Sequence, residues 1–305
     1  MIKTELYEQA LLETIKRGAT EISPDVRNAF VAAIEREDDA AARRGLEATL
    51  QSMDMSAVRK NPLCVDTGWP IFYFKVGNEC RLEGGFVELE NAARRAVAEA
   101  TRLGYLRATM KHPLTGYDPG NNIGMNIPDF TYQFVEGDAI EISYAAKGGG
   151  SECFGGTRHR IVAFADGVKG IEKFVIDSFV ASARAGAVCP PSVLGIGIGG
   201  TANVAANLAK EAACLREVGS RHPDPMFAEI EERLYEALNS LGVGILGAGG
   251  RTSVLAVNVE YAYTHIAGIA CATSTNCMVA RRASSRVTAD GRIEKMKSPM
   301  WFGDR

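Results

Sequence analysis

Four short segments of the chain concentrate residues that can do metal or acid–base chemistry. They are CVDTG at 64–68, GGGSEC at 148–153, CPP at 189–191 and YTHIAGIACATSTNCMVARR at 263–282. Each stands at the expected end of a helix or strand, where a rigid scaffold carries functional loops. Every segment contains a cysteine, and the first and last add the carboxylate of Asp66 and the imidazole of His265. Thiolate metal binding and proton transfer are therefore the chemistries to consider.

The cysteines of the chain are either ligands of an uncommon metal centre or ordinary buried residues. The chain has seven of them, at positions 64, 80, 153, 189, 214, 271 and 277. An odd number spread over 305 residues does not indicate a secreted disulfide framework. None forms the closely spaced pair of a structural zinc site. Widely separated cysteines suit an iron–sulfur cluster held from several loops, whereas burial as a small apolar residue is the commoner role of a free cysteine.

The glycine-rich run SVLGIGIGGT at 192–201 contains G-x-G-x-x-G at Gly195, Gly197 and Gly200. A dinucleotide site also needs a βαβ unit and an acidic residue about 20 positions later, at the end of a second strand. Here that position falls inside an expected helix near Glu217, which argues against nicotinamide binding. Two interpretations stay open: the glycines allow close backbone packing, or the helix that follows them binds a small anion.

Composition excludes several classes of protein. Hydrophobic residues make up 46% and charged residues 23% of the chain, as in ordinary globular proteins. The formal net charge of -3, with lysines and arginines scattered, gives no footprint for nucleic acid. The start of the chain is amphipathic and lacks a signal-peptide core, and no window reaches the about 18 to 20 apolar residues of a membrane span. We therefore expect a cytoplasmic protein that binds neither nucleic acid nor membrane.

The elements that must position the reactive segments alternate along the chain. Residues 1–58 have a helical pattern, with Ser23 and Pro24 as an N-cap and first turn. Further helices are predicted at 86–103, 168–187, 202–219 (capped by Thr201) and 227–242, and strands at 71–77, on both sides of 136–138, at 192–200, 252–263 and 266–275. The tail at 286–305 is expected to be short and polar. The pattern predicts an α+β fold in one domain over 1–305, in which the helical N-terminal region precedes a mixed β-sheet with flanking helices.

The motifs together resemble the α subunit of the oxygen-sensitive class I iron–sulfur hydro-lyases, the family of class I fumarase and L(+)-tartrate dehydratase. The resemblance is carried, in order, by LCVDTG, AAKGGGSE, CPPSVLGIGIGGTANVAANLAKEA, GSRHPDP and YTHIAGIACATSTNCMVARR. GSRHPDP and the STNC ending are more similar to the tartrate dehydratase side. The resemblance implies a single domain equivalent to the N-terminal domain of class I fumarase. It also implies reversible dehydration of a 2-hydroxy dicarboxylate such as malate, tartrate or a mesaconate-like acid.

The resemblance further implies a [4Fe–4S] cluster held by Cys64, Cys189 and Cys277, which leaves the other four cysteines as packing residues. The iron without a protein ligand would act as a Lewis acid on the substrate. Asp66 and His265 would be catalytic, Asp66 in substrate positioning and proton transfer and His265 in orienting Asp66. Substrate binding would fall to the remaining matched positions: Arg107, Gly149, Gly150 and Thr201. Asp66 in an Asx turn and a structural histidine at a strand end are the plainer alternatives.

Two positions depart from the family pattern. Val65 stands where the family usually has glutamine, which removes one polar contact and favours a less hydroxylated or methyl-bearing substrate. GGGSECFGGTRHR replaces the GGGSENKS of many fumarases, which changes the pocket wall if this loop lines it.

The resemblance also implies a partner. The family's further arginine, lysine and threonine residues, including the proposed base, come from a C-terminal domain of about 200 residues, a size within the usual range of domains. Because the sequence ends at Arg305, we expect a separate β subunit and an α₂β₂ assembly. The alternatives are a non-catalytic iron–sulfur or redox-sensing subunit and, less favoured, an NAD-dependent oxidoreductase.

Overall fold

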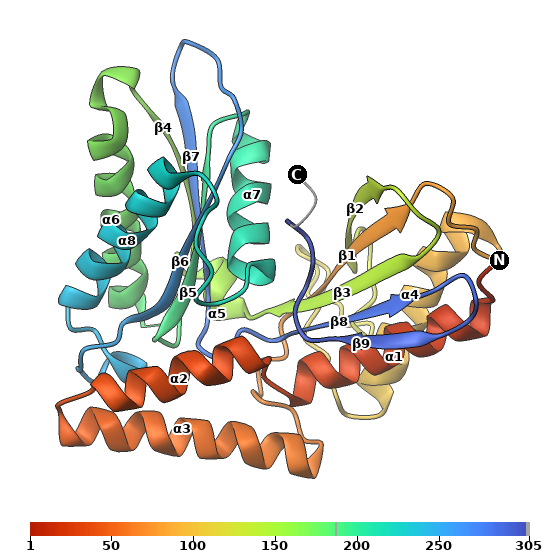
Figure 1. Ribbon diagram of the computed structural model, residues 1–305. Helices are drawn as coiled ribbons and strands as arrows, with labels where there is room; N and C mark the ends of the chain where they lie inside the picture. The colour runs from red at the N-terminus through yellow and green to blue at the C-terminus, as the bar shows by residue number, and fades with distance from the viewer. Residues whose placement is uncertain (187, 303–305) are drawn as a thin grey trace. The chain divides into compact units, whose positions relative to one another are not determined.

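The structure is a computed structural model that describes residues 1–186 and 188–302. Its contacts divide the chain into two compact units. The first unit consists of Met1–Ser23, Ser52–Lys147 and the chain from Arg281 on, and the second of Pro24–Gln51 and Gly148–Ala280. Each unit contains helices and a mixed β-sheet (Figure 1), so the predicted α+β class is confirmed.

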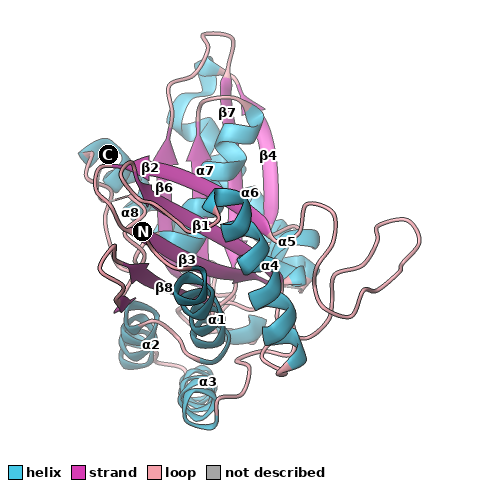
Figure 2. Ribbon diagram, turned by 90° about the vertical axis from the view of Figure 1, so that its right-hand side faces the viewer, coloured by secondary structure: helices cyan, strands magenta, loops and turns pink. Residues whose placement is uncertain are grey.

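The first unit is built on a five-stranded sheet of order β2-β1-β3-β8-β9. Its elements are α1 (Thr4–Thr20), β1 (Trp69–Gly77), α4 (Gly85–Arg102), β2 (Asp129–Val135), β3 (Ile140–Lys147), β8 (Arg282–Val287) and β9 (Ile293–Met296). β1 and β2 are parallel, and the other neighbouring strands are antiparallel. α1 and α4 lie side by side (Figure 2).

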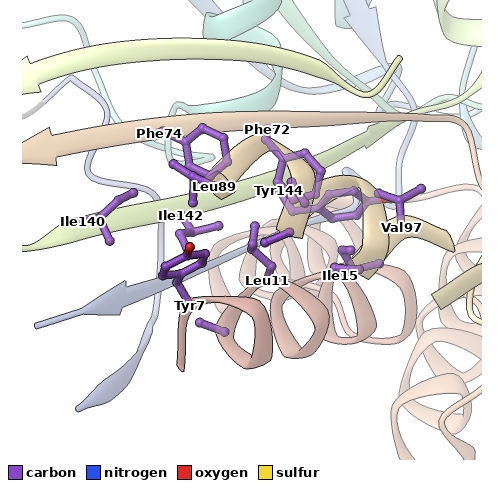
Figure 3. Close-up of a cluster of buried hydrophobic side chains, with 14 of the residues drawn as sticks. Tyr7, Leu11, Ile15, Phe72, Phe74, Leu89, Val97, Ile140, Ile142 and Tyr144 are labelled. Atoms are coloured by element: carbon purple, nitrogen blue, oxygen red, sulfur yellow. The ribbon is translucent and has the colours of Figure 1, made fainter. Parts of the chain in front are cut away.

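The core of the first unit lies between these two helices and the sheet (Figure 3). Tyr7, Leu11 and Ile15 recur at intervals of four on α1 and therefore share one face of the helix. They meet alternate side chains of the strands, of which Phe72 and Tyr144 are completely buried. The period-2 alternation of a strand thus sends one face of β1 and β3 toward the helices.

The opposite face of β1 is covered by Met300 and Trp301. Tyr73 packs edge-on against Trp301 with ring centroids 5.4 Å apart, and Lys75 donates to the carbonyl oxygen of Met300. The prediction of a short polar tail at 286–305 is wrong over the described part, because β8 pairs with β3, β9 pairs with β8, and Trp301 is buried. Residues 303–305 lie outside the described residues.

The second unit is built on a four-stranded sheet of order β4-β7-β5-β6. Its elements are α2 (Pro24–Arg36), α5 (Gly149–Cys153), β4 (Thr157–Val162), η1 (Phe164–Asp166), α6 (Gly167–Ala185), β5 (Ser192–Ile198), α7 (Ala202–Leu215), α8 (Pro225–Ser240), η2 (Ile245–Gly247), β6 (Val254–Tyr261) and β7 (Ile269–Asn276). α3 (Ala40–Arg59) begins in the second unit and ends in the first. α7 covers one face of the sheet and α6 and α8 the other (Figure 1). The predicted helix at 168–187 is α6, and residue 187 lies outside the described residues.

The glycine-rich run forms β5 and the turn into α7. A Cβ atom on Gly195 would lie 2.0 Å from the carbonyl oxygen of Ala209, and one on Gly197 would lie 1.9 Å from that of Ala205. Both distances are far below van der Waals contact, so only glycine lets α7 approach the strand this closely. The packing interpretation of these two glycines is confirmed.

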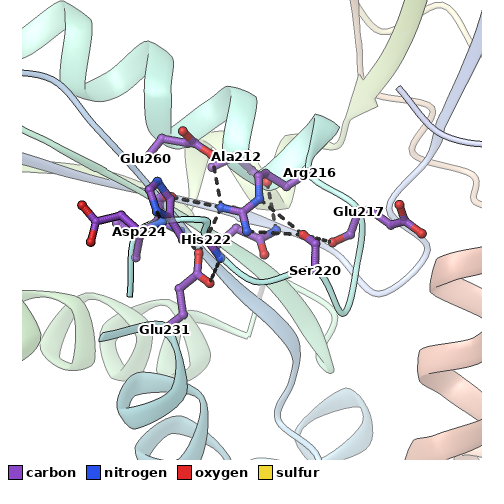
Figure 4. A network of polar contacts seen from close by, with 10 residues as sticks. Ala212, Arg216, Glu217, Ser220, His222, Asp224, Glu231 and Glu260 are labelled. Atoms are coloured by element: carbon purple, nitrogen blue, oxygen red, sulfur yellow. Dashed lines mark hydrogen bonds and ion pairs between the residues drawn. The ribbon is translucent and has the colours of Figure 1, made fainter. Parts of the chain in front are cut away.

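Side chains rather than a further strand cover the outer edge of β6 (Figure 4). Arg216 Nη1 donates to the carbonyl oxygen of Val259 at 3.1 Å, and the amide of Val259 donates to Glu231 Oε1 at 2.8 Å. Arg216 and Glu231 are themselves paired at 3.0 Å and almost completely buried, and Glu260 supplies a second carboxylate at 3.1 Å. The pair satisfies backbone groups that an exposed edge would offer to another chain.

No helix among residues 1–186 and 188–302 is both long and apolar enough to cross a membrane.

Candidate functional site

Cys189 and Cys277 lie together at one end of the second unit's sheet. β5 and β7 are antiparallel with Val193 opposite Asn276, so β5 begins where β7 ends. The amide of Met278 donates to the carbonyl oxygen of Cys189 at 3.0 Å and joins the two cysteine loops. Cys189 is exposed, Cys277 is half-buried, and both are free of disulfides. The fold therefore brings two of the three predicted cluster ligands together.

The GGGSEC segment reaches the same end of this sheet. Gly149 and Gly150 begin the short helix α5, which packs against β7. Gly156, just beyond α5, accepts a hydrogen bond from the amide of Thr275 at 2.6 Å, two residues before Cys277. Three of the four reactive segments of the sequence thus converge in one unit.

The cysteines outside the predicted ligand set have different surroundings. Cys214 and Cys271 are completely buried, as predicted, and burial raises the pKa of Cys271 to about 12. Cys80 packs against the core of the first unit, and burial raises its pKa as well. Cys153 is exposed on α5, so the prediction that it packs in the interior is wrong. This short helix leaves its last residue at the surface.

Cys64 and Asp66 belong to the first unit, in the loop that enters β1. Asp66 Oδ1 accepts a hydrogen bond from the amide of Gly68 at 3.1 Å, and Gly68 has a φ of 75°. This is the Asx turn that the sequence offered as the plainer interpretation of Asp66. Arg281, which is buried, donates to the carbonyl oxygen of Asp66. The loop is thus fixed through both the side chain and the backbone of Asp66.

Arg107 is attached to the same loop. Its amide donates to Thr67 Oγ1 at 3.0 Å, and its carbonyl oxygen accepts from Asn122 Nδ2 at 2.9 Å. The guanidinium group is exposed and makes no hydrogen bond or ion pair with any residue that the structure describes. Arg107 therefore stands beside the Asp66 loop with a cationic group available to a ligand.

The residue that organises this segment, Asn122, was not predicted from the sequence. Asn122 is buried, with a φ of 61°, and its Oδ1 accepts from the amides of Thr109 at 2.9 Å and Met110 at 3.3 Å. Its Nδ2 also donates to Thr101 Oγ1 at 3.0 Å. The pair of asparagines after a glycine at 120–122 was the available signal, because asparagine tolerates a positive φ. Arg281 was also not predicted, although it lies within the motif YTHIAGIACATSTNCMVARR.

His265 and Thr201 lie at the other end of the second unit's sheet. Ile198, the last residue of β5, pairs with Cys271 and with Tyr261, so Thr201 and the β6–β7 loop follow that end. His265 is in this loop, exposed, and its Nδ1 accepts from the amide of Ala267 at 3.1 Å. A strand of seven residues spans about 20 Å. The fold does not bring His265 or Thr201 to Cys189 and Cys277.

The thiols fit an iron–sulfur cluster in their chemistry. No three His, Cys, Asp or Glu side chains within residues 1–186 and 188–302 are already grouped as a metal site. The second unit nevertheless presents two thiols on joined loops, both reachable from solvent, and the first unit holds the half-buried Cys64. Thiolates from separate loops are the donors that such clusters use.

Known proteins agree on one family. Residues 8–286 match the family described as Fumarate hydratase (Fumerase). The chain is 35% identical over 285 residues to the "Putative L(+)-tartrate dehydratase subunit alpha" of Methanocaldococcus jannaschii, which covers 93% of this chain and 98% of that protein. It is 39% identical over 236 residues to the L(+)-tartrate dehydratase subunit alpha of Escherichia coli strain UTI89, covering 77% of this chain and 75% of the relative. The chain therefore belongs to the fumarate hydratase family and is a hydro-lyase.

Proposed function

We propose that this chain is the α subunit of a cytoplasmic, two-subunit [4Fe–4S] hydro-lyase that reversibly dehydrates a 2-hydroxy dicarboxylate. The observation that carries the proposal is the junction of the Cys189 and Cys277 loops by the Met278 hydrogen bond, in a chain of this family. The relatives are named as alpha subunits, which supports a separate β subunit of about 200 residues, a common domain size, and an α₂β₂ assembly.

We assign cluster binding to Cys64, Cys189 and Cys277. The cluster, when bound, supplies an iron with an open position, a Lewis acid for the hydroxyl that leaves as water. Cys189 and Cys277 are held at a fixed spacing because both loops grow from hydrogen-bonded strands. Gly149 and Gly150 support substrate binding in this proposal, since α5 packs against β7, the strand that leads to Cys277.

Arg107 and Asp66 carry the chain's own part of the reaction. The unengaged guanidinium of Arg107 binds a substrate carboxylate, for which its planar fork is suited. The carboxylate of Asp66 positions the substrate and exchanges a proton with it, while its loop is held by Gly68 and Arg281. The roles of His265 and Thr201 stay predictions, because both residues lie at the opposite end of the sheet from the two cysteines.

Iron binding tests the ligand assignment. After anaerobic reconstitution with iron and sulfide, the full-length chain should show broad brown absorbance, and Cys189→Ser and Cys277→Ser should each remove most of it. Cys153→Ser is the matched control, because this thiol is exposed but is not an assigned ligand, and it should keep its colour. A colourless wild-type protein, or full absorbance in Cys277→Ser, would contradict the assignment.

A further inference from the structure

A cavity of about 440 Å³ lies in the second unit, but a larger and more apolar one lies in the first. The cavity in the first unit has a volume of about 520 Å³. Its walls come from Trp69, at the start of β1, and from the irregular chain between α4 and β2, which contributes Met110, Tyr117 and Ile127. A volume of a few hundred cubic ångströms with a mainly apolar lining is typical of a small-molecule site.

Three polar groups on this lining favour a negatively charged ligand. Thr109 Oγ1 is buried and has no hydrogen-bond partner among the residues that the structure describes. His112 Nδ1 accepts from the amides of Leu114 at 3.3 Å and Thr115 at 3.1 Å, so the proton of the neutral ring is on Nε2. Lys111 makes no ion pair with any described residue. The residues of the cavity wall therefore carry a hydroxyl, an imidazole N–H and an ammonium group, and no described residue that lines it carries a carboxylate.

The cavity and Arg107 are parts of one fixed segment. Asn122 accepts from the amides of Thr109 and Met110 and donates to the carbonyl oxygen of Arg107. Trp69 follows Asp66 by three residues, on the strand that the Asp66 loop enters. The two residues proposed for substrate binding and proton transfer thus precede the lining residues Thr109 and Trp69 by two and three positions in the sequence.

We propose that this cavity is the specificity pocket of the dehydration site and receives a small carboxylate that carries an alkyl group, with Thr109, Lys111 and His112 as specificity residues. The assignment rests on the proposed function. The carboxylate would pair with Lys111 and the partnerless hydroxyl of Thr109, and the alkyl group would contact Met110 and Trp69. A second hydroxyl in place of the alkyl group would give up its hydrogen bonds to water and find no hydrogen-bond partner on this apolar wall. The cavity therefore disfavours hydroxyl-rich acids.

Tryptophan fluorescence measures binding in the cavity directly. The chain has two tryptophans, so Trp301→Phe leaves Trp69, on the cavity wall, as the only tryptophan. Titration of this full-length variant with 2-methylmalate should give a saturable change, and tartrate should bind at least about tenfold more weakly, the effect of one unpaired hydroxyl. Should Trp301→Phe fold poorly, wild-type protein compared with Trp69→Phe gives the same information.

Substitutions in the cavity test whether the acid binds there or elsewhere on the protein. Lys111→Ala and Thr109→Val should each weaken the response at least about tenfold, as expected for a hydrogen bond to a charged group. Lys169→Ala, an exposed lysine on α6, is the matched control and should change nothing. No saturable change with any acid, or a response that both cavity variants retain, overturns the proposal.

Steady-state kinetics of the αβ complex separate a specificity pocket from an effector site. Lys111→Ala should raise KM for the methyl-bearing acid about tenfold or more and leave kcat within about threefold, since uniform binding is lost. If Lys111→Ala loses the Trp69 fluorescence response but keeps the wild-type KM, the specificity role is overturned. A complex that dehydrates no acid counts against the proposed function, whereas the Trp69 titration still decides whether the cavity binds a carboxylate.

Discussion

Asn122 is predicted to determine the stability of the first unit. Its side chain makes four hydrogen bonds, to the amides of Thr109 and Met110, to Thr101 Oγ1 and to the carbonyl oxygen of Arg107. A net value of about 1 kcal/mol for each, reduced where water enters or another partner exists, gives about 2–4 kcal/mol for Asn122→Gly. The Arg107 carbonyl keeps a partner, because Thr67 Oγ1 also donates to it.

A second substitution separates the side chain from the backbone. Asn122 has a φ of 61°, which glycine adopts freely and alanine does not. Asn122→Ala should therefore be less stable than Asn122→Gly by about a further 1 kcal/mol. Both tryptophans, Trp69 and Trp301, belong to the first unit, so fluorescence during urea unfolding reports on this unit.

The outcomes differ clearly. If Asn122→Gly unfolds within about 0.5 kcal/mol of the wild type, the range of an ordinary surface substitution, the hydrogen bonds do not stabilise the segment and the reasoning fails. Asn122→Gly should also lower kcat/KM of the αβ complex by up to about a hundredfold, because displacement of a binding group by about 1 Å has effects of this size.

Three further predictions concern the second unit. Gly197→Ala should destabilise the protein by about 3 kcal/mol or prevent folding, because its Cβ would lie 1.9 Å from the carbonyl oxygen of Ala205; thermal unfolding at wild-type temperature would contradict this. Arg216→Met should cost about 3–5 kcal/mol in urea unfolding, since it leaves Glu231 buried without its cation, and a neutral effect would show that the pair is dispensable. Burial and the neighbouring Arg216 lower the pKa of His222 below its usual 6.5, so the folded state binds fewer protons than the unfolded one. Stability should therefore be complete above pH 6.5 and fall below it by at most about 1.4 kcal/mol per pH unit, and His222→Phe should flatten this slope in melting curves measured between pH 7.5 and 5.5.

The elements that the sequence predicted best are those with strong local patterns. The aromatic and β-branched run at 71–77 is β1, and the amphipathic pattern at 86–103 is α4, each within two residues of its bounds. The helix predicted at 202–219 ends at Leu215, because Arg216 leaves it to cover the edge of β6. β4, β8 and β9 have polar sequences and were missed, since their stabilising contacts come from pairing with β7, β3 and β8, respectively.

The candidate site was predictable in its residues rather than in its geometry. The pairing of the Cys189 and Cys277 loops depends on the register of β5 and β7, which connect across about eighty residues of sequence and have no local signature. The resemblance implied one site for His265 and Cys277, but the chain between them contains the extended strand β7, which holds them at opposite ends. Asn122 acts through long-range hydrogen bonds, so its own sequence neighbours carried only a turn signal.

Dehydration by the αβ complex tests the central claim most directly. The reconstituted complex is supplied with malate, tartrate or 2-methylmalate under anaerobic conditions, and the product alkene is followed by its ultraviolet absorbance. The account predicts turnover of at least one acid by the wild type and by Cys153→Ser, and loss of nearly all turnover in Cys277→Ser. Undiminished turnover in Cys277→Ser would contradict it, and so would a cluster-loaded complex that dehydrates none of the acids, a result that favours an iron–sulfur sensor instead.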